Sequence, residues 1–335
     1  FRFAAAAGLH WQELGRTTLG SGSTTIDVTS LAAKPYLMVL GHYLNSSNGN
    51  LVATFNDDTG SNYIDRRSEN GGSDVPTTAR TNTILADANG IEFFSVGNIT
   101  NESGQEKLML NRMTDMNSSG ASTAPDRWET AGKWANTSNS ISSFKVTCNQ
   151  TMAIGSEVVV LGYDPADTTG GSIWEELASV DTSTAHDVVD TGTFTNKKYL
   201  WVQCFVKGDS NANGSIIFNT DTSNTGYAMR RSYDGANEYS YAGTNPAGSE
   251  GAYDGYGATG AGKYYNMFIV NNGSNEALWI SQINVGEPSG ANNAPHRVEW
   301  VGKWDLTDAI TRIRIKNQDA GTDYDESSIK VWGFD

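Results

Sequence analysis

Long hydrophobic runs, charged residues and catalytic motifs are all scarce in this sequence of 335 residues. No run of about 18 apolar residues occurs, so no membrane span is expected. Only 18% of the residues are charged and the net charge is −15. An acidic surface repels phosphate backbones, so nucleic-acid binding is disfavoured.

Catalytic signatures are missing as well. No nucleophile elbow, zinc-protease motif, phosphate-binding loop or dinucleotide fingerprint is present. The two halves of the chain share no histidine position among the four, which are His10, His42, His186 and His296. A glycosidase needs two carboxylates that converge in a cleft, and no pattern in the sequence indicates such a pair. The sequence therefore predicts a protein that is not an enzyme and holds no cofactor, with Ca²⁺ as the one possible ion.

Cysteine and proline are also rare. The two cysteines, Cys148 and Cys204, fall at different points of the internal repeat described below, so a disulfide repeated within each domain is excluded. Two buried free thiols are expected, with a bond between domains as the alternative. Only 7 prolines accompany 36 glycines, and Asn, Ser and Thr are abundant. This composition favours many short strands joined by turns.

An internal duplication dominates the chain. Residues 124–134 and 294–304 share Pro, Arg, Glu, Gly, Lys and Trp at the same spacing. Similar matches join 36–39 to 199–202 and 160–164 to 331–335. A length of 335 residues already favours two domains. We expect an N-terminal arm at 1–10, either packed on a neighbouring molecule or frayed, a first domain at 11–164, a linker at 165–172 and a second domain at 173–335.

The pattern inside each copy is that of β-strands. Strands are predicted at 36–43, 51–55, 91–96, 107–110, 141–146 and 158–161, with a hairpin turn at 48–50 and another between 96 and 107. The stretch 310–315 places its isoleucines on one face and its arginines on the other. Seven to nine such strands in each copy predict two tandem antiparallel β-sandwiches of the jelly-roll type.

The repeated motif supplies the first candidate site. Residues two apart on a strand share a face, so Arg127 can pair with Glu129, and Arg297 with Glu299. Lys133 and Trp134, with Lys303 and Trp304 in the second copy, lie in the strand or just beyond it. An aromatic and charged platform for a sugar is one interpretation. We favour a structural role, with the Trp packed at a sheet edge or a domain seam, because both copies keep the set.

Two further groups are candidates. Arg66 and Arg67, like Arg230 and Arg231, place adjacent guanidinium groups on opposite faces of a strand. One of each pair can reach a carboxylate, either inward or across an interface, and simple solvation of the arginines is the alternative. The loop after Phe55 offers oxygen ligands for Ca²⁺ in Asp57, Asp58 and Asn62, and its second copy keeps Asp221. Asx turns explain these residues without a metal, and we favour that interpretation.

The repeated set resembles a group of phage and environmental-virus virion proteins of the tail-fibre, decoration or capsid type. The resemblance covers nearly the whole chain and is carried by the loops 55–63 and 218–227, the motifs 125–134 and 295–304, and the endings 162–164 and 333–335. It implies β-sandwich modules, a place in the virion, and contacts with copies of the chain and with other virion proteins. It supplies no catalytic residue. A carbohydrate-binding module, directed for example at host-surface glycans, is the alternative function.

Overall fold

The computed structural model describes residues 10–45, 47–87, 90–167, 171–208, 213–223, 225–243, 251–254, 262–286, 294–318 and 323–335. The N-terminal arm, apart from residue 10, and residues 168–170 of the expected linker lie outside these ranges. All regular elements in the described part of the chain are β-strands, and they pair in antiparallel sheets. None of its segments forms a helix long and apolar enough to cross a bilayer.

Twelve strands build the first copy. Their bounds are β1 (Gln12–Thr18), β2 (Ser23–Val28), β3 (Tyr36–Leu44), β4 (Asn50–Phe55), β5 (Tyr63–Glu69), β6 (Val75–Arg80), β7 (Thr83–Asp87), β8 (Glu92–Thr100), β9 (Lys107–Asp115), β10 (Asp126–Trp134), β11 (Phe144–Met152) and β12 (Glu157–Tyr163).

Twelve more strands build the second copy. Their bounds are β13 (Glu175–Thr182), β14 (Val188–Asp190), β15 (Tyr199–Gly208), β16 (Gly214–Phe218), β17 (Tyr227–Tyr233), β18 (Ala236–Ala242), β19 (Ala252–Tyr253), β20 (Gly262–Val270), β21 (Ala277–Val285), β22 (His296–Trp304), β23 (Ile313–Asn317) and β24 (Tyr324–Phe334).

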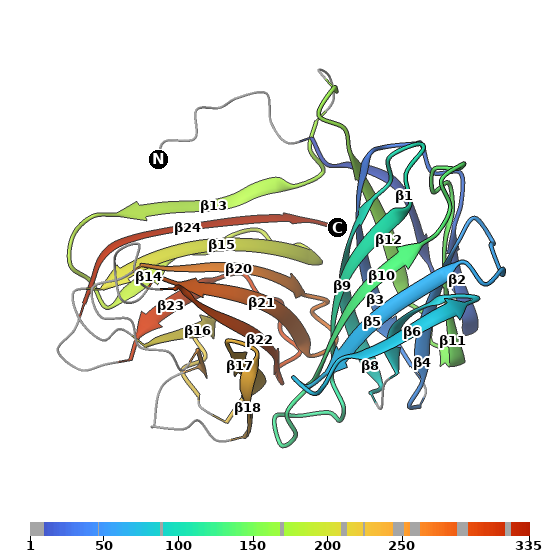
Figure 1. Cartoon of the computed structure of the whole chain (residues 1–335). Helices are drawn as coiled ribbons and strands as arrows, with labels where there is room; N and C mark the ends of the chain where they lie inside the picture. The colour runs from blue at the N-terminus through green and yellow to red at the C-terminus, as the bar shows by residue number, and fades with distance from the viewer. Residues whose placement is uncertain are drawn as a thin grey trace. The chain divides into compact units, whose positions relative to one another are not determined.

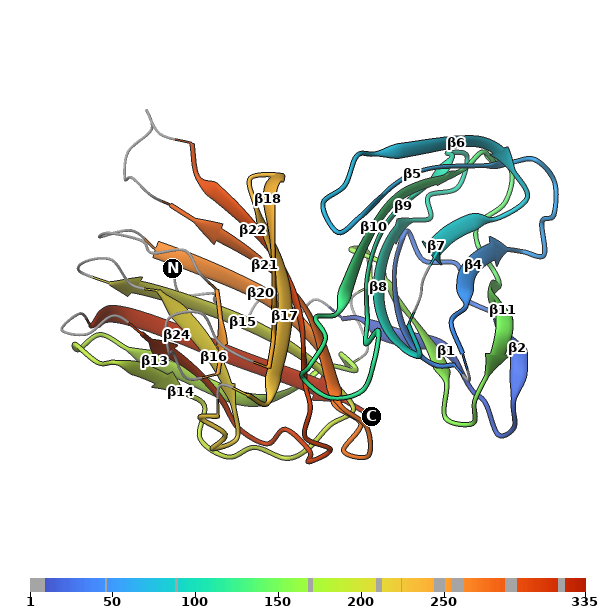
Figure 2. The same cartoon turned by 90° about the horizontal axis from the view of Figure 1, so that it is seen from below.

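The strand order is the same in both copies. The first has an eight-stranded sheet, β1-β12-β3-β8-β9-β10-β5-β6, and a four-stranded sheet, β2-β11-β4-β7 (Figures 1 and 2). The second repeats this order strand for strand, as β13-β24-β15-β20-β21-β22-β17-β18 and β14-β23-β16-β19. Two tandem antiparallel sandwiches that arose by duplication are therefore the architecture of the chain.

Contacts divide the chain into two units that differ slightly from the expected domains. Unit 1 is Phe1–Asp115 with Arg127–Trp174, and unit 2 is Met116–Asp126 with Glu175–Asp335. The first unit ends later than expected because the Ile173 amide donates to the Trp11 carbonyl at 2.8 Å. The segment Met116–Asp126 groups with unit 2, where the Lys303 ammonium contacts the Met116 carbonyl at 3.0 Å.

A single apolar core fills each unit. In unit 1 it includes Phe55, Trp128, Trp134 and Phe144, and in unit 2 the matching strands supply Phe218, Trp300, Trp304 and Ile313. Inward residues alternate with outward ones along the strands. On β15, for example, Leu200, Val202, Cys204 and Val206 all point into the core. Burial of this kind is the main favourable term for both sandwiches.

Two expectations about strands were wrong. The turn at 48–50 joins no hairpin, because β3 pairs with β8 and β12 whereas β4 pairs with β11 and β7 in the other sheet. The number of strands is also larger than seven to nine in each copy. The additional strands, such as β6, have mostly exposed or half-buried side chains and therefore carry no apolar alternation. The predicted hairpin of β8 and β9 is confirmed.

Candidate functional site

The two repeated tryptophans lie inside the sandwiches. Trp134 and Trp304 are each 1% exposed, on strands that have a neighbour on both sides, so neither lies at a sheet edge. The indole nitrogen of Trp134 donates to Oδ2 of Asp58 at 2.7 Å, and that of Trp304 donates to Oδ2 of Asp221 at 2.7 Å. An indole buried this way has no open face on which a sugar can stack.

The loop that contains each of these aspartates has the same construction in both units. The Phe55 amide donates to the Tyr63 hydroxyl at 2.8 Å. Asn56 adopts a positive φ of 53°, which asparagine tolerates better than most residues. Its side-chain oxygen accepts from the Ser142 and Ser143 amides at 2.7 and 3.0 Å. Phe218, Asn219 and Tyr227 repeat these features in unit 2, so the loop is a folding element of the module.

The charged residues of the motif lie on the outer face of the large sheet. Arg297 Nε contacts Glu299 Oε1 at 2.7 Å, so the pairing of residues two apart is confirmed in unit 2. Arg127 is buried and Glu129 half-buried at the matching positions of unit 1. Lys133 contacts Glu106 at 3.1 Å.

The two arginine pairs differ between the copies. Arg66 is exposed and 3.6 Å from Asp74, whereas Arg67 is half-buried and 4.0 Å from Asp65. In unit 2, Arg230 contacts Asp126 at 3.0 Å and Glu238 at 3.7 Å. The neighbouring guanidinium is buried among aromatic rings, with Arg231 lying 4.8 Å from the ring centre of Tyr241. In both units the arginines lie on the strand directly beside the motif strand, where Arg67 pairs with Thr130 and Arg231 with Trp300.

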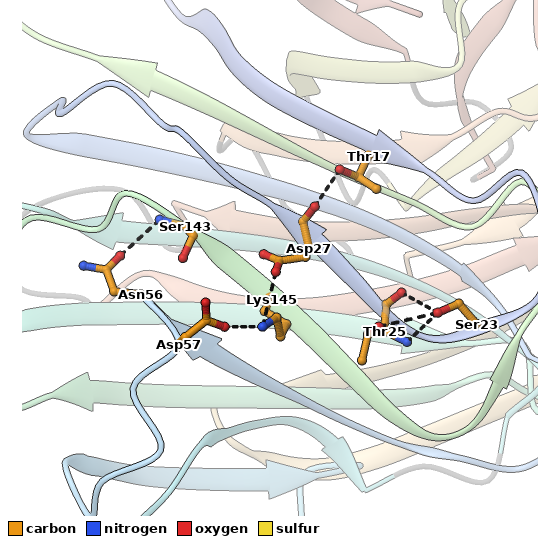
Figure 3. Close-up of polar contacts among 8 residues, drawn as sticks. All are labelled: Thr17, Ser23, Thr25, Asp27, Asn56, Asp57, Ser143 and Lys145. Atoms are coloured by element: carbon orange, nitrogen blue, oxygen red, sulfur yellow. Dashed lines mark hydrogen bonds and ion pairs between the residues drawn. The ribbon is translucent and has the colours of Figure 1, made fainter.

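The proposed calcium ligands point to different partners. Asp57 pairs with Lys145, which also contacts Asp27 at 3.2 Å (Figure 3). The hydrogen bonds to these two carboxylates raise the pKa of the Lys145 ammonium. Asp58 instead accepts bonds from Asn62 and Trp134 and from the amide of Gly60.

The electrostatics of Asp58 follow from these contacts. Desolvation raises its pKa, but the hydrogen bonds from Trp134, Asn62 and the Gly60 amide together outweigh this effect, and the pKa lies below the ordinary value. Asp221 accepts from the Ser223 amide at 2.9 Å in addition to the indole of Trp304. In the described part of the chain, no three His, Cys, Asp or Glu side chains are grouped so that they can hold a metal ion.

Three histidines, His42, His186 and His296, have structural contacts. His42 Nε2 lies 2.7 Å from Glu92 Oε1, and both side chains are buried. His296 contacts Asp234 at 2.8 Å. His186 Nε2 lies 2.7 Å from the Ser327 hydroxyl, but its Nδ1 faces the Thr184 carbonyl, where a catalytic triad would have a carboxylate.

A different feature sits on the outer face of the large sheet of unit 2. Strands β24, β15 and β20 place Trp332, Trp201 and Phe268 directly opposite one another, an arrangement we call the indole row. The Trp201 ring centre is 5.4 Å from that of Trp332 and 5.5 Å from that of Phe268. These side chains point away from the core, because their neighbours along the strands point into it.

On the same face of the sheet, the residues two positions along each strand from the indole row are polar. Lys330, Gln203, Asn266 and Gln282 pair across β24, β15, β20 and β21, and all four are half-buried. We call this set the amide row. The Trp201 indole nitrogen donates to the Asn266 side-chain oxygen at 2.7 Å, which fixes the amide and leaves its NH₂ group as a donor.

Two aromatic rings border the amide row on its other side. Phe205 and Tyr264 pair across β15 and β20 and are 38% and 41% exposed. A side chain at Gly262 would meet Phe205 Cε2 at 2.4 Å, so the phenyl ring lies over the bare glycine. The Tyr264 hydroxyl is hydrogen-bonded to Gln203, and its partial burial raises its pKa. We call these two rings the phenyl row.

Unit 1 lacks this combination. The strand pairing places Leu40 and Val96 where unit 2 has Gln203 and Asn266. Likewise Met38 and Leu161 stand where unit 2 has Trp201 and Trp332. The sandwich therefore forms with aliphatic residues at these positions, and the rows of unit 2 are not a requirement of the fold.

Sequence comparison of the repeats missed this face. A repeat alignment finds what the copies share, and this face is where they differ. The available signal was the alternation of Trp201, Gln203 and Phe205 with apolar residues on β15.

Comparisons with known proteins add little. No family model and no curated protein matches the sequence. Among solved structures, domains LG4–5 of the mouse laminin α1 chain align at 8% identity over 98% of this chain and 92% of that one, with a TM-score of 0.19. The LG1–3 region of the laminin α2 chain aligns at 9% identity over 92% of this chain and 64% of that one, with a TM-score of 0.20. Similarities this weak support no conclusion about function.

Proposed function

We propose that this chain is a non-enzymatic saccharide-binding protein, and that its ligand lies on the outer face of the large sheet of unit 2. The observation that carries the proposal is the amide row between the indole and phenyl rows. A pyranose has an apolar face of C–H groups and a rim of hydroxyls. Aromatic rings contact the first, and amides, which both donate and accept, bind the second.

The chemistry of the face suits an uncharged sugar. Gln203, Asn266 and Gln282 carry no charge, so binding a hydroxyl costs less desolvation than an ionised side chain would require. Lys330 stands at one end of the row and contacts Glu176 at 3.5 Å, so its charge is partly offset. A sulfated or phosphorylated glycan would find no arginine cluster in this row.

The absence of the rows from unit 1 supports the same proposal. Both units bury the repeated tryptophan and build the same loop, so shared folding needs are met by shared residues. The indole, amide and phenyl rows occur in unit 2 alone, so folding does not explain them. Binding of a ligand on the outer face of the sheet would explain them.

The test uses residues that the chain itself supplies. The variant Gln203→Leu with Asn266→Val gives unit 2 the side chains that unit 1 carries at Leu40 and Val96. The full chain and this variant are screened against an immobilised panel of neutral and anionic glycans. We expect the wild type to bind neutral glycans and the variant to lose the signal while it melts at a similar temperature. A blank panel for the wild type would overturn the proposal.

The resemblance to virion proteins leads to a second proposal, that copies of the chain assemble with one another in a particle. One observation favours it. Leu108 and Leu110 on β9 are 55% and 59% exposed, and they lie two residues apart on the outer face of the large sheet of unit 1. Exposed neighbouring leucines are unfavourable in water and are suited to a protein contact. The two proposals are compatible, because they use different units.

A further inference from the structure

A charged pair is buried inside unit 2. Lys263 begins the inward-facing side of β20, and Asp254 follows β19. Lys263 Nζ lies 3.0 Å from Asp254 Oδ2, and each side chain is 1% exposed. Burial of two charges costs desolvation energy that their attraction often fails to recover, so such a pair is weak evidence of a need for stability.

Unit 1 shows that the fold does not require this pair. Phe93 pairs with Tyr43 in unit 1 as Lys263 pairs with Val206 in unit 2, so an apolar ring occupies the lysine position. Leu51 likewise stands where unit 2 has Gly214. Unit 2 has therefore exchanged two core residues for a lysine and a glycine.

The glycine makes room for the carboxylate. A Cβ atom at Gly214 would lie 2.4 Å from the Tyr265 hydroxyl and 2.8 Å from Asp254 Oδ2. Because glycine has no Cβ atom, the Gly214 amide can approach the carboxylate, and it donates to Asp254 Oδ1 at 3.2 Å. The Tyr265 hydroxyl donates to Oδ2 at short range. The two carboxylate oxygens thus have different partners.

These groups match the parts of an acyl-transfer site. Lys263 supplies an amine whose nitrogen lies 3.0 Å from an oxygen of the Asp254 carboxyl group. The Gly214 amide sits where charge develops on Oδ1, as an oxyanion donor does. Tyr265 is buried, which raises the pKa of its phenol far above the ordinary value, so it stays protonated and can act as a general acid toward Oδ2. Fixed neighbours in a dry core gain the rate advantage of high effective concentration.

We propose that Lys263 and Asp254 condense into an intramolecular isopeptide bond. The ammonium first passes a proton to the carboxylate, which leaves a neutral amine and a neutral acid. The nitrogen lone pair attacks Cγ, and the negative charge gathers on Oδ1 beside the Gly214 amide. The C–Oδ2 bond then breaks. Tyr265 gives a proton to Oδ2, which leaves as water. Tyr265 then regains a proton from the lysine nitrogen.

The step is balanced without any co-reactant. Of the three ammonium protons, one stays on the amide nitrogen and two leave with Oδ2. The product replaces two buried charges with a neutral amide, so the desolvation cost of the pair disappears. The bond joins β20 to the residue that follows β19, and this proposal is independent of saccharide binding.

The intact mass of the full chain tests the proposal. A protein with the bond is lighter than its sequence mass by one water molecule. Trypsin cleaves after a free lysine, so the linked protein yields a single peptide, 232–297, that is uncut at Lys263. Fragmentation of this peptide gives no ions from cleavage between Asp254 and Lys263. Lys303, also buried in unit 2, serves as the internal control and is cut in the same denatured digest.

A second route to water loss must be separated. Asp254 precedes Gly255 in the sequence, and Asp-Gly pairs form succinimides, which also lose water. A succinimide leaves Lys263 open to trypsin and persists in the Lys263→Met variant, whereas the isopeptide blocks cleavage and is absent from that variant. A wild-type chain at full sequence mass, or one cut normally after Lys263, overturns the proposal. The wild-type digest decides even if the variant does not fold.

Discussion

The indole nitrogen of Trp304 donates a hydrogen bond to Oδ2 of Asp221 at 2.7 Å, and the ring packs against Phe218 with 5.7 Å between the ring centres. The first copy repeats both distances with Trp134, Asp58 and Phe55. The tryptophan of the repeated motif, for which the sequence favours a structural role, is therefore an internal brace. It links the motif strand to the loop between the two sheets in each unit.

Removal of this brace should lower stability. Trp134→Ala and Trp304→Ala each delete a buried indole, and we expect each to reduce the free energy of unfolding of its own unit by about 3–5 kcal/mol. Trp→Phe at the same positions keeps most of the ring and should cost about 1–3 kcal/mol, mainly through the lost hydrogen bond. Denaturant unfolding followed by circular dichroism measures both. Unchanged stability in the alanine variants would contradict the structural role.

The lowered pKa of Asp58 predicts a pH dependence. Its folded-state pKa lies below its unfolded value, so the ionised carboxylate stabilises unit 1 at pH values above the unfolded pKa of about 3.9. That contribution is lost as the pH falls through the folded pKa. Melting temperatures of the wild type and Asp58→Asn should therefore converge in acid and separate toward neutral pH. A constant difference at every pH would show that the charge of Asp58 has no part in stability.

The two thiols should be inert in the folded protein. Cys148 and Cys204 are both free and buried, as expected from the sequence. Burial raises the pKa of both thiols, so the reactive thiolate is scarce. We expect a thiol reagent to label neither residue under native conditions and both after denaturation. Rapid native labelling of either cysteine would mean that its core opens readily.

The assembly proposal predicts an effect of the exposed leucines. The double variant Leu108→Gln, Leu110→Gln should weaken self-association, measured by sedimentation over a range of concentrations, with little change in melting temperature. Leu306→Gln is the matched control, because Leu306 is also an exposed leucine but lies in unit 2. A wild-type chain that stays monomeric at every concentration would count against assembly, and equal effects of both variants would count against this surface.

The sequence was sufficient for the architecture because folding residues recur. The shared Trp134 and Trp304 and the paired loops identified the duplication, and the alternation on β23 indicated an antiparallel strand. Edge strands were missed because solvent on both sides removes the apolar pattern, as on β6. The turn at 48–50 was misassigned because a chain that crosses between sheets uses the same turn residues as a hairpin.

The candidate sites were harder to predict because their residues do not recur in the two copies. Gln203 and Lys263 have no equivalent in the first copy, where Leu40 and Phe93 occupy their positions. A search for repeated residues does not detect such differences. They are recognised only when the strand register shows which positions of the two copies correspond and which face each side chain occupies.

The most direct test of the saccharide proposal is a calorimetric titration of the strongest neutral glycan from the panel into the wild type and into Phe205→Ala. Phe205 is exposed and lies over Gly262, so its removal takes a ring from the phenyl row with little effect on the core. We predict one site per chain in the wild type and an affinity at least about tenfold weaker in the variant, as expected for the loss of one stacking ring. Undiminished affinity in Phe205→Ala would contradict the proposed site.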